Sequence, residues 1–500
     1  MAGEPIATTT TGTVRGASDD GVAAFKGIPY AAPPVGARRF LPPAPAAPWS
    51  GVRDALEYGA SCPQGSARPE GWSQEPSLSE DCLYLNVWTS ACDEHPRPVM
   101  VWLHGGGFSI GSGSWPVYDG AALARRGDVV VVTVNHRLGI FGYLHLKEIA
   151  GPEFASSGNA GMLDLVAALE WVRDNIAAFG GDPSNVTIFG ESGGGAKVST
   201  LLAMPAARGL FHRAAVQSGP GLRSRVGPGQ ATELAKRVVA DLAGGANSVP
   251  ALQSVPADKL LGFQAKLGRR AMFSFSPVLD EVDLPEHPGD AIRNGAAADV
   301  PMIIGCNRDE ATLFLAMESG LDGLTVLDGD HVPPRLESLG EHARPIIETY
   351  CRTRPDASPR DLLVAIESDR MMRIPSIELA ERKFAGGQAP VFMYLFCWAA
   401  GPLGSAHGYE IPFVFDNARP PVMPESVGRG SLAAQMSDAW IAFARSGAPD
   451  HPGIPHWPAY SRDDRATMIF DRDAACVRND PSGEERAAWQ DAGVPVGMPA

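Results

Sequence analysis

The segment from Asn185 to Ala196 is a β-branched run that breaks into glycines on both sides of Ser192. Glycine removes the side chains that would collide where a chain turns sharply from a strand into a helix. The residues from Ala196 to Met204 have the composition of the helix that should follow. Its N-terminus would present free N–H groups and a positive dipole beside Ser192. This pattern is typical of a nucleophile elbow, the turn that carries a reactive serine.

A second copy of the Gly-x-Ser-x-Gly pattern surrounds Ser109. The residues after it, 112–116, combine serine, glycine and proline and cannot begin a helix. The context of a strand, a turn and a helix therefore favours Ser192 as the reactive serine. The alternative for Ser192 is a glycine-rich turn without chemistry.

Continuous apolar, β-branched runs predict strands that are covered on both faces of a mostly parallel sheet. Between Gly161 and Phe179, apolar residues recur at helical spacing, which places a helix between two such strands. The predicted strands are 99–103, 129–134, the run from 185, 214–217, 301–305 and 389–398. This alternation predicts an α/β fold with a large, mostly parallel central sheet and helices on both faces.

Two segments, about 230–295 and 311–383, are mainly helical in pattern. A length of 500 residues would by itself suggest several domains. Strand patterns resume after each segment, however, so we expect both to be cap-like insertions above the sheet of one domain that spans 1–500.

The formal net charge of −15 argues against nucleic acid and anionic membrane surfaces as partners. No stretch approaches the roughly 18 apolar residues of a transmembrane helix, and residues 1–5 lack the features of a secretory signal. We expect a soluble, cytoplasmic protein, with a secreted mature form as the alternative. The seven cysteines lack zinc-binding spacing, so we expect no metal site. The oligomeric state stays open.

A reactive serine needs a base within hydrogen-bond reach and an acid that orients the base. In α/β-hydrolase order both follow the serine. Asp309 and Glu310 stand just past the strand at 301–305, and their spacing does not decide between them. His407 follows the strand at 389–398 after a loop of small residues, which favours it as the base over a structural histidine.

The run from His104 to Phe108 contains three glycines at the end of the predicted strand 99–103. Such a run exposes backbone N–H groups that can donate two hydrogen bonds to a developing oxyanion. A glycine triplet alone also fits a flexible turn. Together with the elbow at Ser192, it predicts one assembled site.

Further runs extend the pattern over nearly the whole chain. They are 25–31 (FKGIPYA), 79–88 (SEDCLYLNVW), 135–139 (NHRLG), 158–161 (GNAG), 179–183 (FGGDP) and 407–410 (HGYE). In this order, and with the glycine triplet and the elbow, they resemble the type-B carboxylesterase family, an α/β-hydrolase group that includes bacterial para-nitrobenzyl esterases, animal liver carboxylesterases and cholinesterases.

The resemblance implies a serine carboxylesterase that hydrolyses small to medium esters through an acyl-enzyme, without a metal or other cofactor. Ser192 would be the nucleophile and His407 the base. Glu310 would be the triad acid, in preference to Asp309. The alternatives are a specialised substrate (a carbamate, an activated amide, or a phthalate, pyrethroid or mycotoxin ester), an interfacial lipase, and a non-catalytic binding relative. The last is disfavoured because all three triad positions are filled.

The resemblance also implies that Gly106, Gly107 and Gly193 donate the oxyanion-hole N–H groups. The chain departs from the family at two positions. Gly193 stands where the family usually has alanine, so we expect a looser turn. Ala311 stands where the family usually has glycine, which makes the turn after the acid less certain.

Five more residues take expected places from the same resemblance. Trp72 and Phe108 would line the substrate pocket. Glu191 would lie beneath the site, with a buried structural carboxylate as the alternative. Cys62 and Cys82 correspond to a family disulfide, with two reduced thiols as the alternative.

Overall fold

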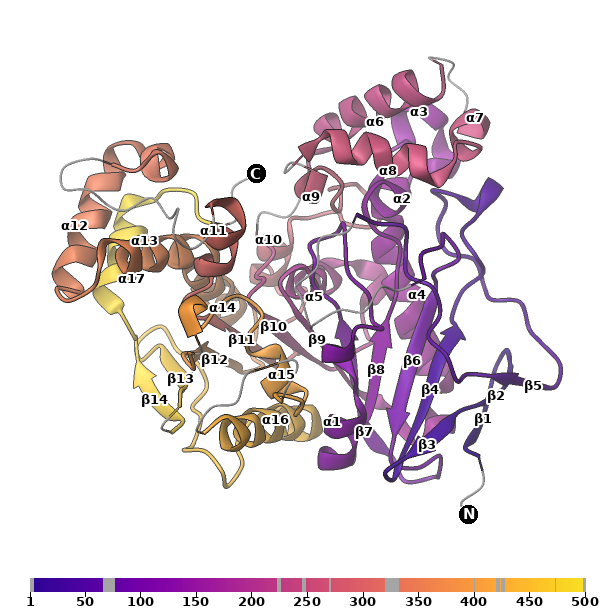
Figure 1. The fold of residues 1–500 in the computed structure, drawn as a ribbon, viewed down its shortest axis with the longest axis horizontal. Coiled ribbons are helices and arrows are strands. Elements are labelled where there is room, and N and C mark those ends of the chain that lie inside the picture. The colour runs from indigo at the N-terminus through magenta and orange to yellow at the C-terminus, as the bar shows by residue number, and fades with distance from the viewer. Residues whose placement is uncertain are drawn as a thin grey trace.

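The computed structural model describes residues 4–65, 77–222, 226–244, 249–268, 271–319, 332–399, 401–419, 423, 428–472 and 474–497. The strands of its large sheet are β3 (Ala17–Asp19), β4 (Val22–Pro29), β6 (Tyr84–Thr89), β7 (Arg97–Leu103), β8 (Val130–Val134), β9 (Gly181–Glu191), β10 (Arg213–Gln217), β11 (Met302–Asn307), β12 (Val391–Phe396), β13 (Ala466–Phe470) and β14 (Cys476–Asn479). Their order across the sheet is β14-β13-β12-β11-β10-β9-β7-β8-β6-β4-β3 (Figure 1). A smaller sheet joins β1 (Ile6–Thr9), β2 (Gly12–Arg15) and β5 (Val52–Asp54).

The middle of the large sheet is parallel. The strands from β8 through β7 and β9 to β13 pair in parallel, whereas β3, β4, β6 and β14 pair antiparallel. Every residue of β7, β8 and β11 is buried, which explains their continuous apolar sequences. All the predicted strands are present, and the parallel strands end at one shared edge of the sheet.

Helices cover both faces of this sheet, as predicted. They are α1 (Ala121–Gly127), α2 (Gly139–Tyr143), α3 (Lys147–Ala150), α4 (Ala160–Asn175), α5 (Gly193–Ala203), α6 (Pro228–Leu242), α7 (Val249–Gln253), α8 (Ala257–Lys266), α9 (Ala271–Ser274), α10 (Pro288–Arg293), α11 (Ala311–Ser319), α12 (Ala343–Thr353), α13 (Pro359–Ser368), α14 (Ile374–Gly386), α15 (Ile411–Val414), α16 (Arg429–Ser446) and α17 (Gly483–Ala492). Within the described ranges, none of them is long and apolar enough to cross a membrane.

Neighbouring strand residues belong to opposite cores because side chains alternate along a strand. Val101 and Ile188 pack in the core that includes α4 and α5. Trp102 and Phe189, the next residues along β7 and β9, pack in the core that includes α1 and α16. The sheet is therefore buried on both sides where the site residues emerge from it.

The two segments predicted to be helical hold α6 to α10 and α11 to α14. Figure 1 shows α6, α7 and α8 grouped at the top of the view, and α12, α13 and α17 grouped at the left. The second group has a core of its own, in which Trp489 Nε1 donates to Tyr350 Oη over 2.9 Å. The assignment of the whole chain to one domain stays a prediction.

Two of the sequence runs quoted above carry ion pairs, one fully buried and one partly buried. Arg137 pairs with Asp164 of α4, with 2.6 Å between Nη2 and Oδ1, and both side chains are buried. Arg39 pairs with Glu80 over 2.5 Å and also donates to the carbonyl of Val255. Removing one partner of a buried pair costs about 3–5 kcal/mol. These ion pairs therefore hold the N-terminal region and the helices together.

Candidate active site

Ser192 lies alone between the end of β9 and the start of α5. Its backbone angles are φ 58° and ψ −121°, a strained conformation for a residue with a side chain. Its N–H donates to Gln217 O over 2.9 Å, and its carbonyl accepts from Ala196 N over 3.0 Å. The helix thus begins at Gly193, three residues before the predicted start, because the glycines themselves form its first turn. The predicted elbow is present.

The second Gly-x-Ser-x-Gly copy folds into a simple turn. The N–H groups of Ser109 and Ile110 both donate to the carbonyl of Gly106, over 3.3 and 3.1 Å. The next helical element is a short 3-10 turn over Pro116–Tyr118. Ser109 is therefore not on an elbow, as its sequence context predicts.

A carboxylate and an imidazole meet at the edge where the parallel strands end. Glu310 lies three residues after β11, and His407 lies in the loop after β12, the neighbouring strand. The His407 Nδ1 atom is 2.5 Å from Glu310 Oε2. The other oxygen of Glu310 accepts from Asn307 N over 2.7 Å, and the side chain is fully buried. This pair orients the His407 ring.

Asp309, the neighbour of Glu310, points to different partners. Its carboxylate pairs with Arg308 over 2.9 Å and accepts from the backbone N–H of Ser405 over 2.8 Å. It therefore shapes the loop that leads to His407 without contacting the ring. Of the two carboxylates that spacing left open, Glu310 is the one that contacts the His407 ring. Ala311 begins α11 and donates to Ser368 Oγ, so the departure from the family at this position leaves the acid in place.

Two further carboxylates surround His407. Glu191 Oε1 lies 3.2 Å from His407 Nε2, at an angle that makes no hydrogen bond. Glu410 is fully buried and accepts from Asn307 Nδ2 over 2.7 Å. The imidazole is therefore enclosed by acidic groups contributed by three separate segments.

These carboxylates change the protonation of the imidazole. Burial lowers the pKa of His407, but Glu191 and Glu310 raise it by more, to about 9. Burial and Glu310 raise the pKa of Glu410 to about 7. Burial also raises the pKa of Glu191 well above its ordinary value. The site therefore favours the imidazolium form of His407 at neutral pH.

The glycine loop, which we define as Gly105 to Gly107, lies directly against the elbow. A Cβ placed on Gly105 would be 3.0 Å from Glu191 Oε2 and 3.6 Å from Ser192 Cβ. A Cβ placed on Gly193 would be 2.4 Å from Gly107 N and 2.2 Å from Gly107 O. The expectation of a looser turn at Gly193 is therefore wrong. Glycine at this position allows the loop to approach α5 more closely than a methyl group would permit.

The residues predicted to line the substrate pocket are Trp72, Phe108 and Glu191. Trp72 lies outside the described residues. Phe108 is only 3% exposed, and its ring packs edge-on against Tyr143. Phe314 of α11 was not predicted from the sequence. It stands four residues after Glu310, and its ring centroid lies 4.9 Å from that of His407. The place of Phe108 and Glu191 in a substrate pocket stays a prediction.

Cys62 and Cys82 are buried, free thiols, and the Cys82 thiol hydrogen-bonds to Cys62. Cys62 Sγ also accepts from Leu138 N over 3.2 Å. Both cysteines are thiols in this structure, and their pairing as the family disulfide stays a prediction. Among the described residues, no group of three or more His, Cys, Asp or Glu side chains is placed to hold a metal ion.

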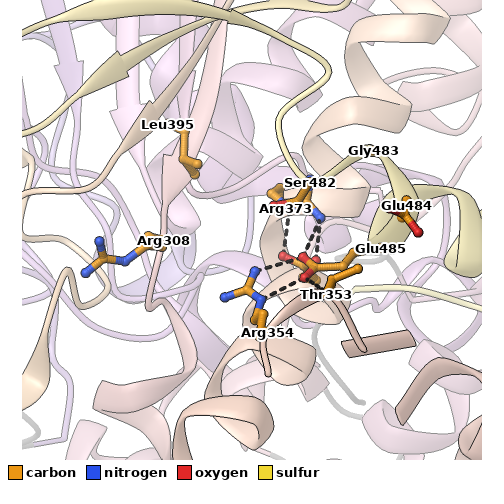
Figure 2. A pocket seen from close by; sticks show the side chains of 10 residues that line it. Arg308, Thr353, Arg354, Arg373, Leu395, Ser482, Gly483, Glu484 and Glu485 are labelled. Atoms are coloured by element: carbon orange, nitrogen blue, oxygen red, sulfur yellow. Dashed lines mark hydrogen bonds and ion pairs between the residues drawn. The ribbon is translucent and has the colours of Figure 1, made fainter. Parts of the chain in front are cut away.

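A cavity of about 440 Å³ lies between α17 and the π-helical turn Asp369–Arg373, and it contains arginines that could suggest an anion site (Figure 2). Each of them already has a carboxylate partner. Arg354 donates to Glu485 over 2.7 Å, Arg373 to Asp369 over 2.5 Å, and Arg308 pairs with Asp309. The arginines that line the cavity are therefore used in ion pairs, and those with Glu485 attach α17 to the rest of the fold.

Comparison with known proteins places the chain in a family. The family model described as "Carboxylesterase family" matches residues 3–489. The chain belongs to the carboxylesterase family. This carboxylesterase is 40% identical over 499 residues to para-nitrobenzyl esterase of Bacillus subtilis, covering 96% of this chain and 97% of that protein. It is 37% identical over 481 residues to fumonisin B1 esterase of Sphingopyxis macrogoltabida, covering 91% and 84%.

Solved structures agree with the sequence comparison. A carboxylesterase of Geobacillus stearothermophilus superimposes with a TM-score of 0.85 at 42% identity, over 97% of this carboxylesterase and 100% of that chain. The α/β-hydrolase fold and the carboxylic ester hydrolase activity that the resemblance implied are confirmed.

Proposed function

We propose that this carboxylesterase hydrolyses small to medium carboxylic esters through an acyl-enzyme on Ser192, with His407 as the base and Glu310 as the triad acid. The contact of 2.5 Å between His407 Nδ1 and Glu310 Oε2 carries the proposal. A carboxylate can only accept, so Nδ1 carries a proton, and the lone pair of the neutral ring is then on Nε2.

In the first half of the reaction, His407 Nε2 takes the proton of Ser192 as the hydroxyl oxygen attacks the ester carbonyl carbon. Glu310 stabilises the imidazolium that forms. The protonated ring then donates its proton to the departing alcohol, which leaves the acyl group on Ser192. In the second half a water molecule repeats these steps and releases the acid.

The negative charge that develops on the carbonyl oxygen needs hydrogen-bond donors already in place. We assign this role to the N–H groups of Gly106, Gly107 and Gly193. The close approach of Gly107 to Gly193 supports the assignment, because it brings the glycine loop and the first residue of α5 to the same side of the elbow.

An organophosphate adduct tests the nucleophile. A fluorophosphonate ester should phosphonylate one residue, and peptide mapping by mass spectrometry should locate the added mass on the peptide that contains Ser192. The peptide that contains Ser109, the serine of the other Gly-x-Ser-x-Gly copy, serves as the internal control and should stay unmodified. An adduct on any other serine would refute the proposed site.

The carboxylates around His407 predict an alkaline pH dependence. The base must be neutral to act, so kcat/KM should fall as the pH drops below the His407 pKa of about 9. Glu191→Gln removes a carboxyl group whose ionised form raises the pKa of His407. The midpoint of the acid limb should therefore move down towards 6.5, the ordinary value for an imidazole.

The measurement is the pH profile of kcat/KM for a neutral ester. Glu367→Gln is the matched control, because Glu367 is also fully buried but pairs with Arg370, away from His407. The control should keep the midpoint of the parent protein. An unchanged midpoint in Glu191→Gln would contradict the assignment of the limb to His407.

A further inference from the structure

Lys197 is a fully buried lysine in the second turn of α5, the helix that starts at the elbow (Figure 1). Its Nζ atom donates to the carbonyl oxygen of His104 over 2.9 Å and lies 5.6 Å from the ring centroid of Phe108. Among the described residues, Glu191 is the carboxylate that acts on Lys197, and it does so through space without a direct ion pair. Burying an ammonium group without a counter-ion is costly, so the position calls for a role.

The carbonyl that Lys197 binds belongs to the peptide group that leads into the glycine loop. Lys197 also stands four residues after Gly193, on the same face of α5. One side chain therefore joins the two segments that would donate N–H groups to the oxyanion. The backbones are already in close contact at this place, since a Cβ on Gly194 would lie 1.9 Å from Leu103 O and 3.1 Å from His104 O.

We propose that Lys197 is a positioning residue that holds the glycine loop against the start of α5 and thereby sets the strength of the oxyanion hole. This inference rests on the function proposed above. Lys197 acts through the loop and does not touch the substrate. Its contribution should therefore appear in the transition state, where the oxyanion forms, and not in the binding of the ester.

The charges near Lys197 are consistent with this role. Burial lowers the pKa of Lys197 to about 7, although Glu191 opposes the shift. The rings of His104 and His136 stack 4.9 Å apart beside it, and burial together with Lys197 lowers the pKa of both well below the ordinary value. These two rings stay neutral, so Lys197 is the member of this cluster that can carry a positive charge near neutral pH. In its protonated form, Lys197 places a positive charge beside the loop, which favours negative charge on the developing oxyanion.

Lys383 offers a matched control within the same chain. It is also fully buried, and its Nζ donates to a backbone carbonyl, that of Ala298, over 3.1 Å. Burial lowers its pKa as well, to about 8. Lys383 differs from Lys197 in its position in the fold. It attaches α14 to the segment before β11 and contacts neither the glycine loop nor α5.

The test compares Lys197→Met with Lys383→Met, using a para-nitrophenyl ester and the concentration of active sites titrated with an organophosphate. Lys197→Met should lower kcat per active site by about tenfold or more, which is less than the 100- to 1,000-fold typical of losing one oxyanion donor. KM should stay within about twofold. Lys383→Met should keep the kcat of the parent protein, whatever it does to the melting temperature.

A trifluoromethyl ketone distinguishes positioning from a general structural role. It forms a tetrahedral adduct whose oxygen carries the negative charge, so its affinity should fall by the same factor as kcat in Lys197→Met. Lys197→Gln keeps an N–H donor but not the charge, so its kcat and its affinity for the ketone should lie between those of Lys197→Met and the parent protein. It replaces Lys197→Met in the test if that variant does not fold. Unchanged kcat per titrated site, or unchanged ketone affinity, would overturn the inference. Phosphonylation of Ser192 in the parent protein separates that result from a failure of the proposed function.

Discussion

Ser192→Ala should lower kcat for a para-nitrophenyl ester by about a millionfold, the loss typical of removing a triad serine. The variant keeps the oxyanion donors and the binding site, so a residual acceleration over water remains. It should fold normally, because alanine replaces serine at the same strained backbone angles and no glycine is disturbed. Turnover is measured at high enzyme concentration, and folding by circular dichroism and melting temperature.

Ser109→Ala is the matched control for this variant. Ser109 has the same Gly-x-Ser-x-Gly neighbours but lies in a turn that does not lead directly into a helix. Its kcat should stay within about threefold of the parent protein. Retained turnover in Ser192→Ala, after contaminating parent protein has been excluded by mass spectrometry, would sink the assignment of the nucleophile.

Glu310→Gln should lower kcat by about 10,000-fold, whereas Asp309→Asn should lower it by no more than a few-fold. The amide keeps the size of Glu310 but loses the charge that stabilises the imidazolium, and its NH₂ group can favour the wrong tautomer of His407. Asp309 contacts Arg308 and Ser405 in a partly exposed pair, which typically contributes little.

Steady-state kinetics on both single variants and on Ser192→Ala combined with Glu310→Gln provides the measurement. Because the triad acts as a unit, the double variant should be hardly slower than Ser192→Ala alone. A larger loss in Asp309→Asn than in Glu310→Gln would reverse the choice of acid.

The elbow and the glycine loop could be predicted because both depend on backbone conformation. A strand that ends in glycines around one serine has few ways to continue, and the structure places Ser192 in the strained turn that this pattern implies. The central strands were predictable for a similar reason, since only strands buried on both faces tolerate such continuous apolar runs.

The choice of the acid could not be made from spacing alone. Asp309 and Glu310 are neighbours that follow the same strand, and the family resemblance was needed to prefer one. Their side chains leave the backbone in different directions at the start of α11, and only Glu310 reaches the ring of His407. Which of two adjacent carboxylates faces the ring cannot be told from the sequence, because it depends on how the ends of β11 and β12 lie beside each other.

The surroundings of Gly193 and Lys197 could not be predicted from the sequence either, because both depend on contacts with the glycine loop. Glycine after the nucleophile suggested a looser turn, whereas the glycine loop uses the free space and packs against Gly193. Lys197 matched no short pattern, and a lysine inside a helix is ordinarily an exposed residue. Its burial depends on the glycine loop, a segment about ninety residues earlier in the chain, as the separation of 93 residues to His104 shows.

Local sequence patterns were therefore sufficient to predict the main backbone features of this protein, which are its alternating strands and helices, the elbow at Ser192 and the glycine loop after β7. These follow from steric restrictions that act over a few neighbouring residues. Which carboxylate orients His407, how many acidic groups surround it and how closely the glycine loop meets α5 were decided only when distant segments packed together. Those features depend on side-chain direction and burial, which arise from contacts between residues far apart in the chain.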